Sequence, residues 1–306
     1  MSLSVQSITK EYGTQKAVNN LSFDVSGGTI MGFLGPNGAG KSTTMKIVSC
    51  YLSPTSGTAE VCGYDIHKNP LEVRRHIGYL PENNPLYLDM YVREYLQFVA
   101  GIHKIDKKAN RVKELIDMTG LGKEQHKLIG ALSKGYRQRV GLAQAMIHNP
   151  DVLILDEPTS GLDMNQLVDI RNLITELGKE KTVILSTHIM QEVQAMCDRV
   201  IIINNGSLVA DDPIEKLSER ISGEQQITIN LLNNDVPLSK LESIPGVTQV
   251  KNTKDGIIIT SDAKNDIRKE VFEQAVASDW VIIEMKKDEI SVEDVFQKLT
   301  KDTVNA

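Results

Sequence analysis

The sequence contains no long hydrophobic run. No stretch of consecutive apolar residues exceeds four, whereas a membrane-spanning helix needs about 20. The first residues, MSLSVQSITKEYG, include no apolar core of the kind that a secretory signal carries. We therefore expect a soluble chain that is not exported.

Cysteine is scarce as well. The three cysteines, Cys50, Cys62 and Cys197, form no C-x-x-C pair, so the pattern indicates neither a disulfide framework nor a zinc site. A reducing cytoplasm is the expected compartment. Five of the six histidines are scattered without metal-ligand spacing, and we expect them to be surface or cap residues: His67, His76, His103, His126 and His148.

Positive charge is in the minority. The 34 Lys and Arg residues face 40 Asp and Glu residues, which gives a net charge of −6. Proteins that bind nucleic acid non-specifically use a broad positive field, and this chain lacks one. We therefore expect no nucleic-acid partner. Hydrophobic residues make up 41% and charged residues 24% of the chain, which is ordinary for a globular protein.

The length of 306 residues and the order of patterns predict two domains. Short β-type segments fill the first 65 residues, helical periodicity follows from about 92 to 148, and apolar strands return at 151–156, 182–188 and 199–210. We predict an α/β domain over 1–218, with a mixed-sheet core at 1–84 and 150–218 and an inserted helical subdomain at about 85–149. Residues 165–180 are typical of an amphipathic crossover helix.

A small α+β domain is predicted over 225–306. Its pattern is strand, short helix, two strands joined at KNTKDG, helix, strand and helix. The segments QQITINLL and WVIIEM are expected to supply outer strands.

A glycine-rich loop follows an apolar strand and precedes a helix in GFLGPNGAGKSTT. This is the context of the G-x-x-x-x-G-K-[ST] phosphate loop. Glycines at 35, 38 and 40 let backbone N–H groups turn toward an anion where we expect a Cβ to obstruct. Lys41 is expected to reach the β- and γ-phosphates, Ser42 to ligate Mg²⁺ and Thr43 to bond the α-phosphate.

Two acidic residues follow the buried strand VLIL. Asp156, at its carboxyl end, is a candidate Mg²⁺ ligand, and Glu157 is a candidate general base for hydrolysis. Alone this pair is a weak signal, but together with the phosphate loop it predicts a nucleotide hydrolase.

In these residues the chain resembles the ATP-binding-cassette (ABC) ATPases over nearly all of 1–215. The motifs occur in the family's order and are listed here: Tyr12 in KEYG, GPNGAGKST, LSKGYRQR, LILDEP, SGLD and STH. The resemblance implies an ABC cassette that binds ATP and Mg²⁺. It also implies that Tyr12 stacks on adenine and that the loop residues Gly35, Pro36, Asn37, Gly38, Ala39, Gly40, Lys41, Ser42 and Thr43 hold the phosphates.

The family architecture implies a shared active site between two head-to-tail cassettes, either two copies of this chain or one copy and a related ATPase subunit. Ser133 and Gly135 of one chain would then contact the γ-phosphate on the other, because Ser133 starts a helix whose dipole favours negative charge. His188 would contact the γ-phosphate, and Asp163 would contact the partner cassette across the interface. Arg137 and Arg139 are expected to make structural or interface ion pairs.

The sequence departs from the family pattern at three positions. Lys134 and Tyr136 stand at the third and fifth places of the usual L-S-G-G-Q stretch, and Glu82 stands where the family has a glutamine. A carboxylate at Glu82 could ligate Mg²⁺ and take part in turnover, while adding negative charge near the γ-phosphate.

The chain looks most similar to ATPases that serve separate export-type (ABC-2) permeases, and within them to the gliding-motility subunits. The likeness to the ABC-2 branch lies in the departures just named and in SVEDVFQKLT. The likeness to the gliding-motility subunits lies in PENNPLYLDMYVREYL and in the stretch from LSKGYRQR to SGLD. We expect an integral membrane permease as partner, which contacts this chain near PENNPLYLDM. We also expect the chain to be located on the inner face of the cell membrane.

Two alternatives remain open at this stage. One is an ABC ATPase that acts on nucleic acid or the ribosome; a single phosphate loop and no long heptad run disfavour it. The other is a nucleotide-gated module that hydrolyses slowly or not at all. Glu157 and His188 disfavour that module, whereas Glu82 leaves it possible.

Overall fold

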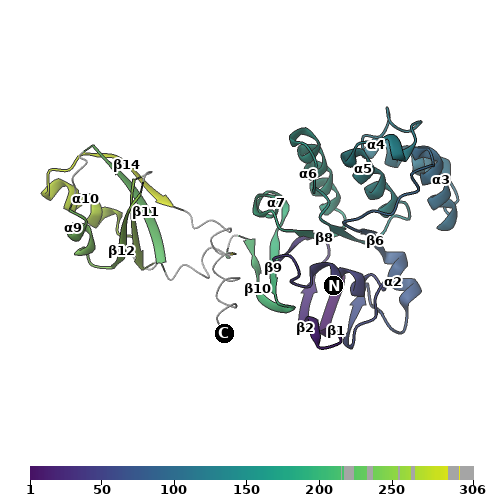
Figure 1. Cartoon of the computed structure of the whole chain (residues 1–306), viewed down its shortest axis with the longest axis horizontal. Coiled ribbons are helices and arrows are strands. Elements are labelled where there is room, and N and C mark those ends of the chain that lie inside the picture. Colours follow the sequence, from purple (N-terminus) through teal and green to yellow (C-terminus); the bar gives the residue numbers. More distant parts are fainter. Residues whose placement is uncertain are drawn as a thin grey trace. The chain divides into compact units, whose positions relative to one another are not determined.

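The computed structural model of the chain describes residues 1–214, 216, 224–232, 237–253, 256–262, 266–288 and 296. It divides into two compact units, Met1–Pro213 and Ile214–Ala306 (Figure 1). The predicted boundary at 218 lies outside the described residues. No helix among the described residues is long and apolar enough to cross a membrane.

The first unit contains two sheets. A four-stranded antiparallel sheet has the order β2-β1-β4-β5, and a six-stranded mixed sheet has the order β10-β9-β3-β8-β7-β6. The strands of the first sheet are β1 (Leu3–Tyr12), β2 (Gln15–Val25), β4 (Ser56–Val61) and β5 (Tyr64–Asp65). Those of the second are β3 (Ile30–Leu34), β6 (Ile77–Leu80), β7 (Val152–Asp156), β8 (Thr182–Thr187), β9 (Arg199–Asn204) and β10 (Ser207–Pro213).

One hydrophobic core joins the two sheets. Buried and exposed residues alternate at the ends of β2 and β4, as expected for strands with one buried face, whereas β1 is buried at three successive residues, Leu3–Val5, and again at Ile8. Buried apolar residues of all three strands pack with β3, β7 and β9 of the second sheet, where for example the rings of Phe23 and Phe33 lie 5.5 Å apart. Strands β3, β7 and β8 are buried along their whole length, and β8 pairs in parallel with both β3 and β7, as is usual for strands buried on both faces.

The predicted helical insertion lies between two strands of the second sheet. Between β6 and β7 lie α3 (Val92–Ile102), α4 (Lys108–Met118), the short 3₁₀ helix η1 (Ile129–Ala131) and α5 (Lys134–Ala145), grouped together in Figure 1. The other helices of this unit are α1 (Lys41–Val48), α2 (Pro70–His76), α6 (Met164–Gly178) and α7 (Met190–Met196). Helix α6 confirms the predicted crossover between β7 and β8.

The prediction of a single strand over 199–210 is wrong. The segment is a hairpin of β9 and β10, with Asn205 and Gly206 at the turn, both at positive φ. A two-residue Asn-Gly turn is the usual signal for such a hairpin, and here the flanking apolar run concealed it.

The second unit has one four-stranded antiparallel sheet of order β12-β13-β11-β14. Its elements are β11 (Glu224–Leu231), α9 (Leu238–Glu242), β12 (Val247–Thr253), β13 (Gly256–Asp262), α10 (Arg268–Ala277) and β14 (Ile282–Asp288). This order of elements agrees with the pattern read from the sequence. The expected final helix, in SVEDVFQKLT, lies outside the described residues except for residue 296. The QQITINLL segment is not an outer strand, because β11 pairs with both β13 and β14.

The insertion packs tightly on the sheet at Gly78. A Cβ on this residue of β6 would collide with the carbonyl oxygen of Ala145, at the end of α5, and would approach Leu153 and Pro150 to within 2.9 Å. The close contact fixes α5 against the strand that leads to Glu82.

We therefore expect Gly78→Ala to destabilise the protein by about 1–3 kcal/mol, because backbone and core atoms must move. The melting temperature should fall by about 2–10 °C in calorimetry. Gly101→Ala is the matched control, since a Cβ at this position in the last turn of α3 meets no atom within 4 Å and an alanine favours a helix by about 0.5–1 kcal/mol over a glycine. Equal melting temperatures for the two variants would contradict this account of the α5–β6 contact.

Candidate functional site

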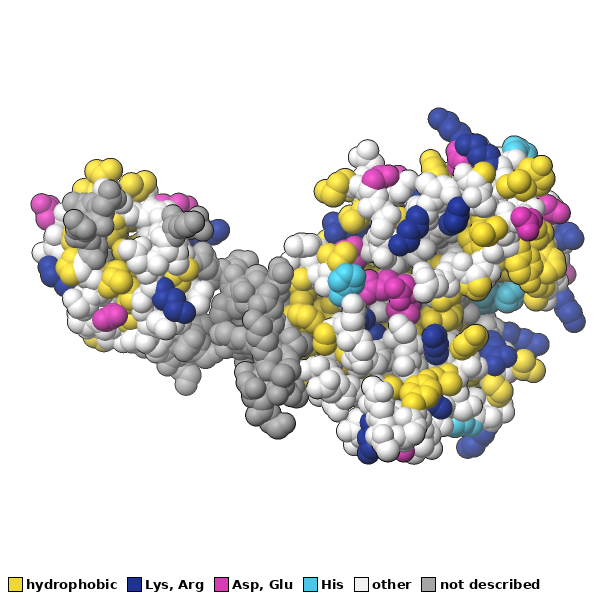
Figure 2. All heavy atoms as spheres, in the orientation of Figure 1, with side chains coloured by type: hydrophobic (Ala, Val, Ile, Leu, Met, Phe, Trp, Pro, Cys, Tyr) yellow, Lys and Arg dark blue, Asp and Glu magenta, His cyan; other side chains and the backbone are white. Residues whose placement is uncertain are grey.

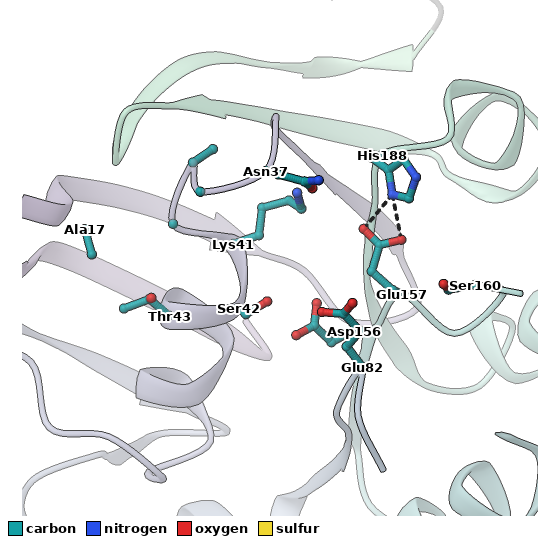
Figure 3. Close-up of a pocket in the computed structure, with 13 residues that line it drawn as sticks. Ala17, Asn37, Lys41, Ser42, Thr43, Glu82, Asp156, Glu157, Ser160 and His188 are labelled. Atoms are coloured by element: carbon teal, nitrogen blue, oxygen red, sulfur yellow. Dashed lines mark hydrogen bonds and ion pairs between the residues drawn. The ribbon is translucent and has the colours of Figure 1, made fainter. Parts of the chain in front are cut away.

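A cavity of about 380 Å³ lies at the carboxyl ends of the parallel strands (Figure 3). This volume is in the usual range for small-molecule sites. Its lining consists of Ala17, Asn37, Gly38, Ala39, Gly40, Lys41, Ser42, Thr43, Glu82, Asp156, Glu157, Ser160 and His188. Eleven of these thirteen residues were predicted from the sequence; Ala17 and Ser160 were not. On the surface, Figure 2 shows acidic side chains next to a histidine on this unit.

The loop between β3 and α1 is shaped by its glycines. Gly38 and Gly40 have φ of 81° and 104°, a region that residues with a Cβ avoid. At Gly40 a Cβ would also collide with the carbonyl oxygen of Ala17, whereas at Gly38 no atom of the chain lies within 4 Å of one. The expectation that a Cβ obstructs at each glycine therefore needs correction for Gly38, where the backbone conformation is the constraint.

Lys41 is buried at the start of α1. Its ammonium group donates hydrogen bonds to the carbonyl oxygens of Gly35, at 2.7 Å, and Pro36, at 3.3 Å. Burial lowers the pKa of Lys41, and the nearby carboxylates of Glu157, Asp156 and Glu82 oppose that shift. The charge is thus held beneath the loop, facing acidic groups across the cavity.

Glu157 and His188 form the most direct contact in the cavity. The Nδ1 atom of His188 lies 2.9 and 3.0 Å from the two carboxylate oxygens of Glu157 (Figure 3). Burial raises the pKa of Glu157, while the hydrogen bond and charge of His188 lower it. Glu157 also has a left-handed backbone, with φ of 52°, a conformation that costs about 1–3 kcal/mol and is common at functional sites.

Asp156 is 2% exposed at the end of β7. Its Oδ1 atom is buried and has no hydrogen-bond partner among the described residues. Figure 3 places its carboxylate beside that of Glu82, facing Ser42. A cluster of hard oxygen donors with an unsatisfied buried carboxylate oxygen fits a small divalent cation such as Mg²⁺.

A second layer of contacts supports His188. Thr187, just before it, donates from its hydroxyl to the buried carboxylate of Glu192 at 2.9 Å, and accepts from the N–H of Ile189 at 3.1 Å. Glu192 is fully buried in α7. The sequence interpretation missed this residue; a charged residue four positions after the histidine in an otherwise apolar helix face was the available signal.

Several predicted site residues lie outside the cavity lining. Tyr12 is 52% exposed at the end of β1, where the ammonium of Lys10 lies 5.4 Å from its ring centre. Gly35 and Pro36 contribute through the carbonyls that hold Lys41. Tyr12 as an adenine contact stays a prediction.

The segment LSKGYRQR and Asp163 lie close together, and neither lines the cavity that contains the phosphate loop. Ser133 caps α5 by accepting from the N–H of Tyr136 at 3.4 Å, and Asp163 caps α6 by accepting from the N–H of Gln166 at 2.9 Å. A Cβ on Gly135 would collide with the side chain of Gln166. The start of α5 therefore packs against the start of α6.

The charged residues of the same segment, Lys134, Arg137 and Arg139, contact other parts of the first unit. The ammonium of Lys134 lies against Gly161. Arg139 is buried, donates to the carbonyl of Thr119 at 3.0 Å and forms an ion pair with Asp169 at 2.8 Å, which confirms the structural role expected for it. Arg137 donates instead to the carbonyl of Gly130 at 2.8 Å.

Comparisons with known proteins agree with this geometry. Residues 18–160 match the family model described as ABC transporter. A bacitracin transport ATP-binding protein of Bacillus licheniformis is 37% identical over 95% of this chain and 95% of its own length. Nod factor export ATP-binding protein I of Burkholderia orbicola is 36% identical over 73% of this chain and 75% of its own.

Among solved structures, a dimeric bacterial ABC transporter cassette is similar with a TM-score of 0.64 and 25% identity, over 69% of this chain and 98% of its own. The phosphate loop, the acidic strand end and the histidine thus occur in the fold in which the sequence placed them. The chain belongs to the ATP-binding subunits of ABC transporters, and it is an ATPase that binds ATP.

Proposed function

We propose that this subunit powers an export-type ABC transporter of the ABC-2 branch by hydrolysing ATP in the cavity around Lys41 and Glu157. The observation that carries the proposal is the convergence of Lys41, Glu157 and His188 on one cavity. Each comes from a different strand end, and together they offer a cation for phosphate, a carboxylate base and a group that orients that base.

Glu157 supplies the base of the proposed reaction. Its deprotonated carboxylate accepts the proton of a water molecule that attacks the γ-phosphate, and burial makes it more basic than an ordinary glutamate. His188 holds both carboxylate oxygens, so it fixes the direction of the base. Lys41 compensates negative charge on the phosphates.

Ser42, Asp156 and Glu82 are the proposed ligands of Mg²⁺, and the orphaned Oδ1 of Asp156 supports this assignment. When bound, the ion would neutralise charge on the phosphate oxygens. Glu82 differs from the amide of the family pattern by one negative charge. We expect that charge to slow turnover until a partner or substrate rearranges the segment that follows β6.

Ser133, Gly135 and Asp163 are proposed to act on the nucleotide of a second cassette in a head-to-tail dimer. Two features support this. These residues do not line the cavity of their own chain, and they form one packed surface at the starts of α5 and α6. The partner cassette is a second copy of this chain or a related ATPase subunit.

Two relatives support the assignment to a transporter and to export: one is a bacitracin transport protein, and the other is a Nod factor export protein. The narrower assignment to a gliding-motility transporter depends on the resemblance in PENNPLYLDMYVREYL and in the stretch from LSKGYRQR to SGLD. In either case the chain would work at the inner face of the cell membrane, held there by a permease.

A hydrophobic surface on the helical insertion is the proposed permease contact. We define the α3 patch as Tyr87, Tyr91, Phe98 and Ile102, each between 44% and 62% exposed. The rings of Tyr87 and Phe98 lie 5.8 Å apart, and Figure 2 shows hydrophobic side chains gathered at the α3 end of the unit. Exposed apolar surface of this kind marks protein contacts, and it adjoins the segment that carries Glu82.

We expect Glu157→Gln to abolish turnover and to trap an ATP-bound dimer. Loss of a general base should lower kcat by about 10²–10⁴-fold, while phosphate binding through Lys41 remains. Size-exclusion chromatography with saturating MgATP should show a dimer. Glu176→Gln, on an exposed part of α6 where Glu176 pairs with Lys179, is the control and should turn over normally. A Glu157→Gln protein that stays monomeric would contradict the head-to-tail model.

The acid limb of the ATPase pH profile should shift in His188→Ala. The base form of Glu157 exists above its pKa, so activity falls as pH drops through that value. His188 lowers the pKa of Glu157; its removal should therefore raise that pKa and move the acid limb to higher pH, in addition to reducing the maximal rate. The pH dependence of kcat measures the shift, with His126→Ala as an exposed control. An acid limb that stays in place or moves to lower pH would refute the coupling.

Phe98→Asp should separate the ATPase from its permease. A charge in the α3 patch should reduce the permease recovered with the tagged chain from membranes by about ten-fold or more. The ATPase rate of the isolated chain should not change, because Phe98 does not line the cavity. Phe272→Asp, at an exposed phenylalanine of α10, is the matched control. Recovery of ribosomes or DNA in place of a membrane protein would overturn the transport proposal.

A further inference from the structure

Three potential metal ligands meet on the first unit, outside the nucleotide cavity. The thiol of Cys62, the Nδ1 atom of His76 and a carboxylate oxygen of Asp151 all lie within 4.8 Å of one another. We propose that these three side chains form a zinc-binding site, the Cys62–His76–Asp151 site. None of them lines the cavity that contains Lys41.

Each ligand comes from a different segment. Cys62 follows β4, His76 is the last residue of α2, and Asp151 immediately precedes β7. Backbone hydrogen bonds hold all three segments: the N–H of Asp151 donates to the carbonyl of His76 at 3.1 Å, and the N–H of Cys62 donates to the carbonyl of Ser2 at 3.0 Å. The ligands therefore sit on ordered backbone.

The side chains are oriented toward one another. The Nδ1 of His76 lies 2.5 Å from the carboxylate of Asp151, and the ring of Tyr64 stacks on that of His76, with centroids 5.2 Å apart and planes at 19°. Stacking restricts the plane of the imidazole ring, and the contact with Asp151 directs Nδ1 toward the carboxylate. Fixed ligand orientation of this kind favours metal binding.

The donor set selects the metal. Thiolate sulfur, imidazole nitrogen and carboxylate oxygen are the three ligand types of Zn²⁺, and three protein ligands leave a fourth position for water. Mg²⁺ and Ca²⁺ prefer oxygen ligands alone. This combination therefore distinguishes the site from the all-oxygen set of Ser42, Asp156 and Glu82.

Small side-chain movements complete the geometry. Donors about 2.0–2.3 Å from a tetrahedral zinc lie about 3.5 Å from one another. The His76–Asp151 pair thus opens by about 1 Å, which is possible because 62% of the Asp151 side chain is exposed. On binding, the thiol of Cys62 loses its proton to solvent and coordinates as a thiolate, and the proton between His76 and Asp151 also leaves to solvent.

The position of the site indicates its effect. His76 and Asp151 stand at the amino ends of β6 and β7 in the six-stranded sheet, whereas Cys62 follows β4 of the four-stranded sheet. One ion would therefore tie the two sheets together. The same two strands carry Glu82 and Asp156 at their other ends, so zinc binding is expected to stiffen the base of the nucleotide site.

Zinc binding to the full-length chain tests the proposal. The chelator-treated, reduced protein is titrated with zinc chloride against a chromophoric chelator, without nucleotide. We expect one zinc per chain, a loss of affinity on the order of ten-fold or more in Cys62→Ser and in His76→Asn, and no change in Cys50→Ser. Cys50 is the matched control because it is also a half-buried free thiol, in a different environment.

Two further measurements locate the ion. Zinc should slow alkylation of Cys62 but not of Cys50, and it should raise the melting temperature of the wild type and of Cys50→Ser but not of Cys62→Ser. Asp156→Asn should keep its zinc. The proposal is overturned if the wild type binds no zinc, if Cys62→Ser binds zinc as well as the wild type, or if uptake is lost in Asp156→Asn, which would place the ion in the nucleotide cavity.

Discussion

The parallel pairing of β3, β8, β7 and β6 is the constraint on which the site depends. Leu34 pairs with Thr187, Ser186 with Asp156, and Leu155 with Leu80. Because the strands are parallel and in register, the segments that follow all four leave the sheet at one edge. Lys41, His188, Glu157 and Glu82 are far apart in the chain, and this register brings the segments that carry them around one cavity.

This constraint explains which parts of the site could be predicted from the sequence. The phosphate loop has a local pattern in which glycines, lysine and serine have fixed spacing. Asp156 follows a fully apolar strand, so its place at a strand end could be inferred. Ser160 begins the SGLD motif, but the motif alone does not show that its serine faces the cavity. Ala17, an alanine in β2, has no distinguishing pattern, and only the folded chain places both residues in the lining.

The fold was predictable where periodicity was strong and local. Helices α3, α5 and α6 follow from their apolar spacing, whereas the interior position of β11 depends on which strands pair across a whole sheet. The cysteines and histidines show the same limit. His76 and Asp151 are 75 positions apart in sequence, so no spacing rule connects them, and their meeting with Cys62 is a product of how the two sheets pack.

The balance of charge at the cavity favours binding of the nucleotide together with the cation proposed above. Asp156, Glu157 and Glu82 place three carboxylates around the cavity, against one buried ammonium at Lys41 and the imidazole of His188. The phosphates of ATP add more negative charge, which repels the carboxylates more strongly in a partly desolvated site than in water. The orphaned Oδ1 of Asp156 indicates where a cation relieves that repulsion. Glu82 adds a further negative charge at the cavity. With the proposed Mg²⁺ site, we therefore expect ATP affinity in this subunit to depend more on the divalent cation than in a cassette with glutamine at this position.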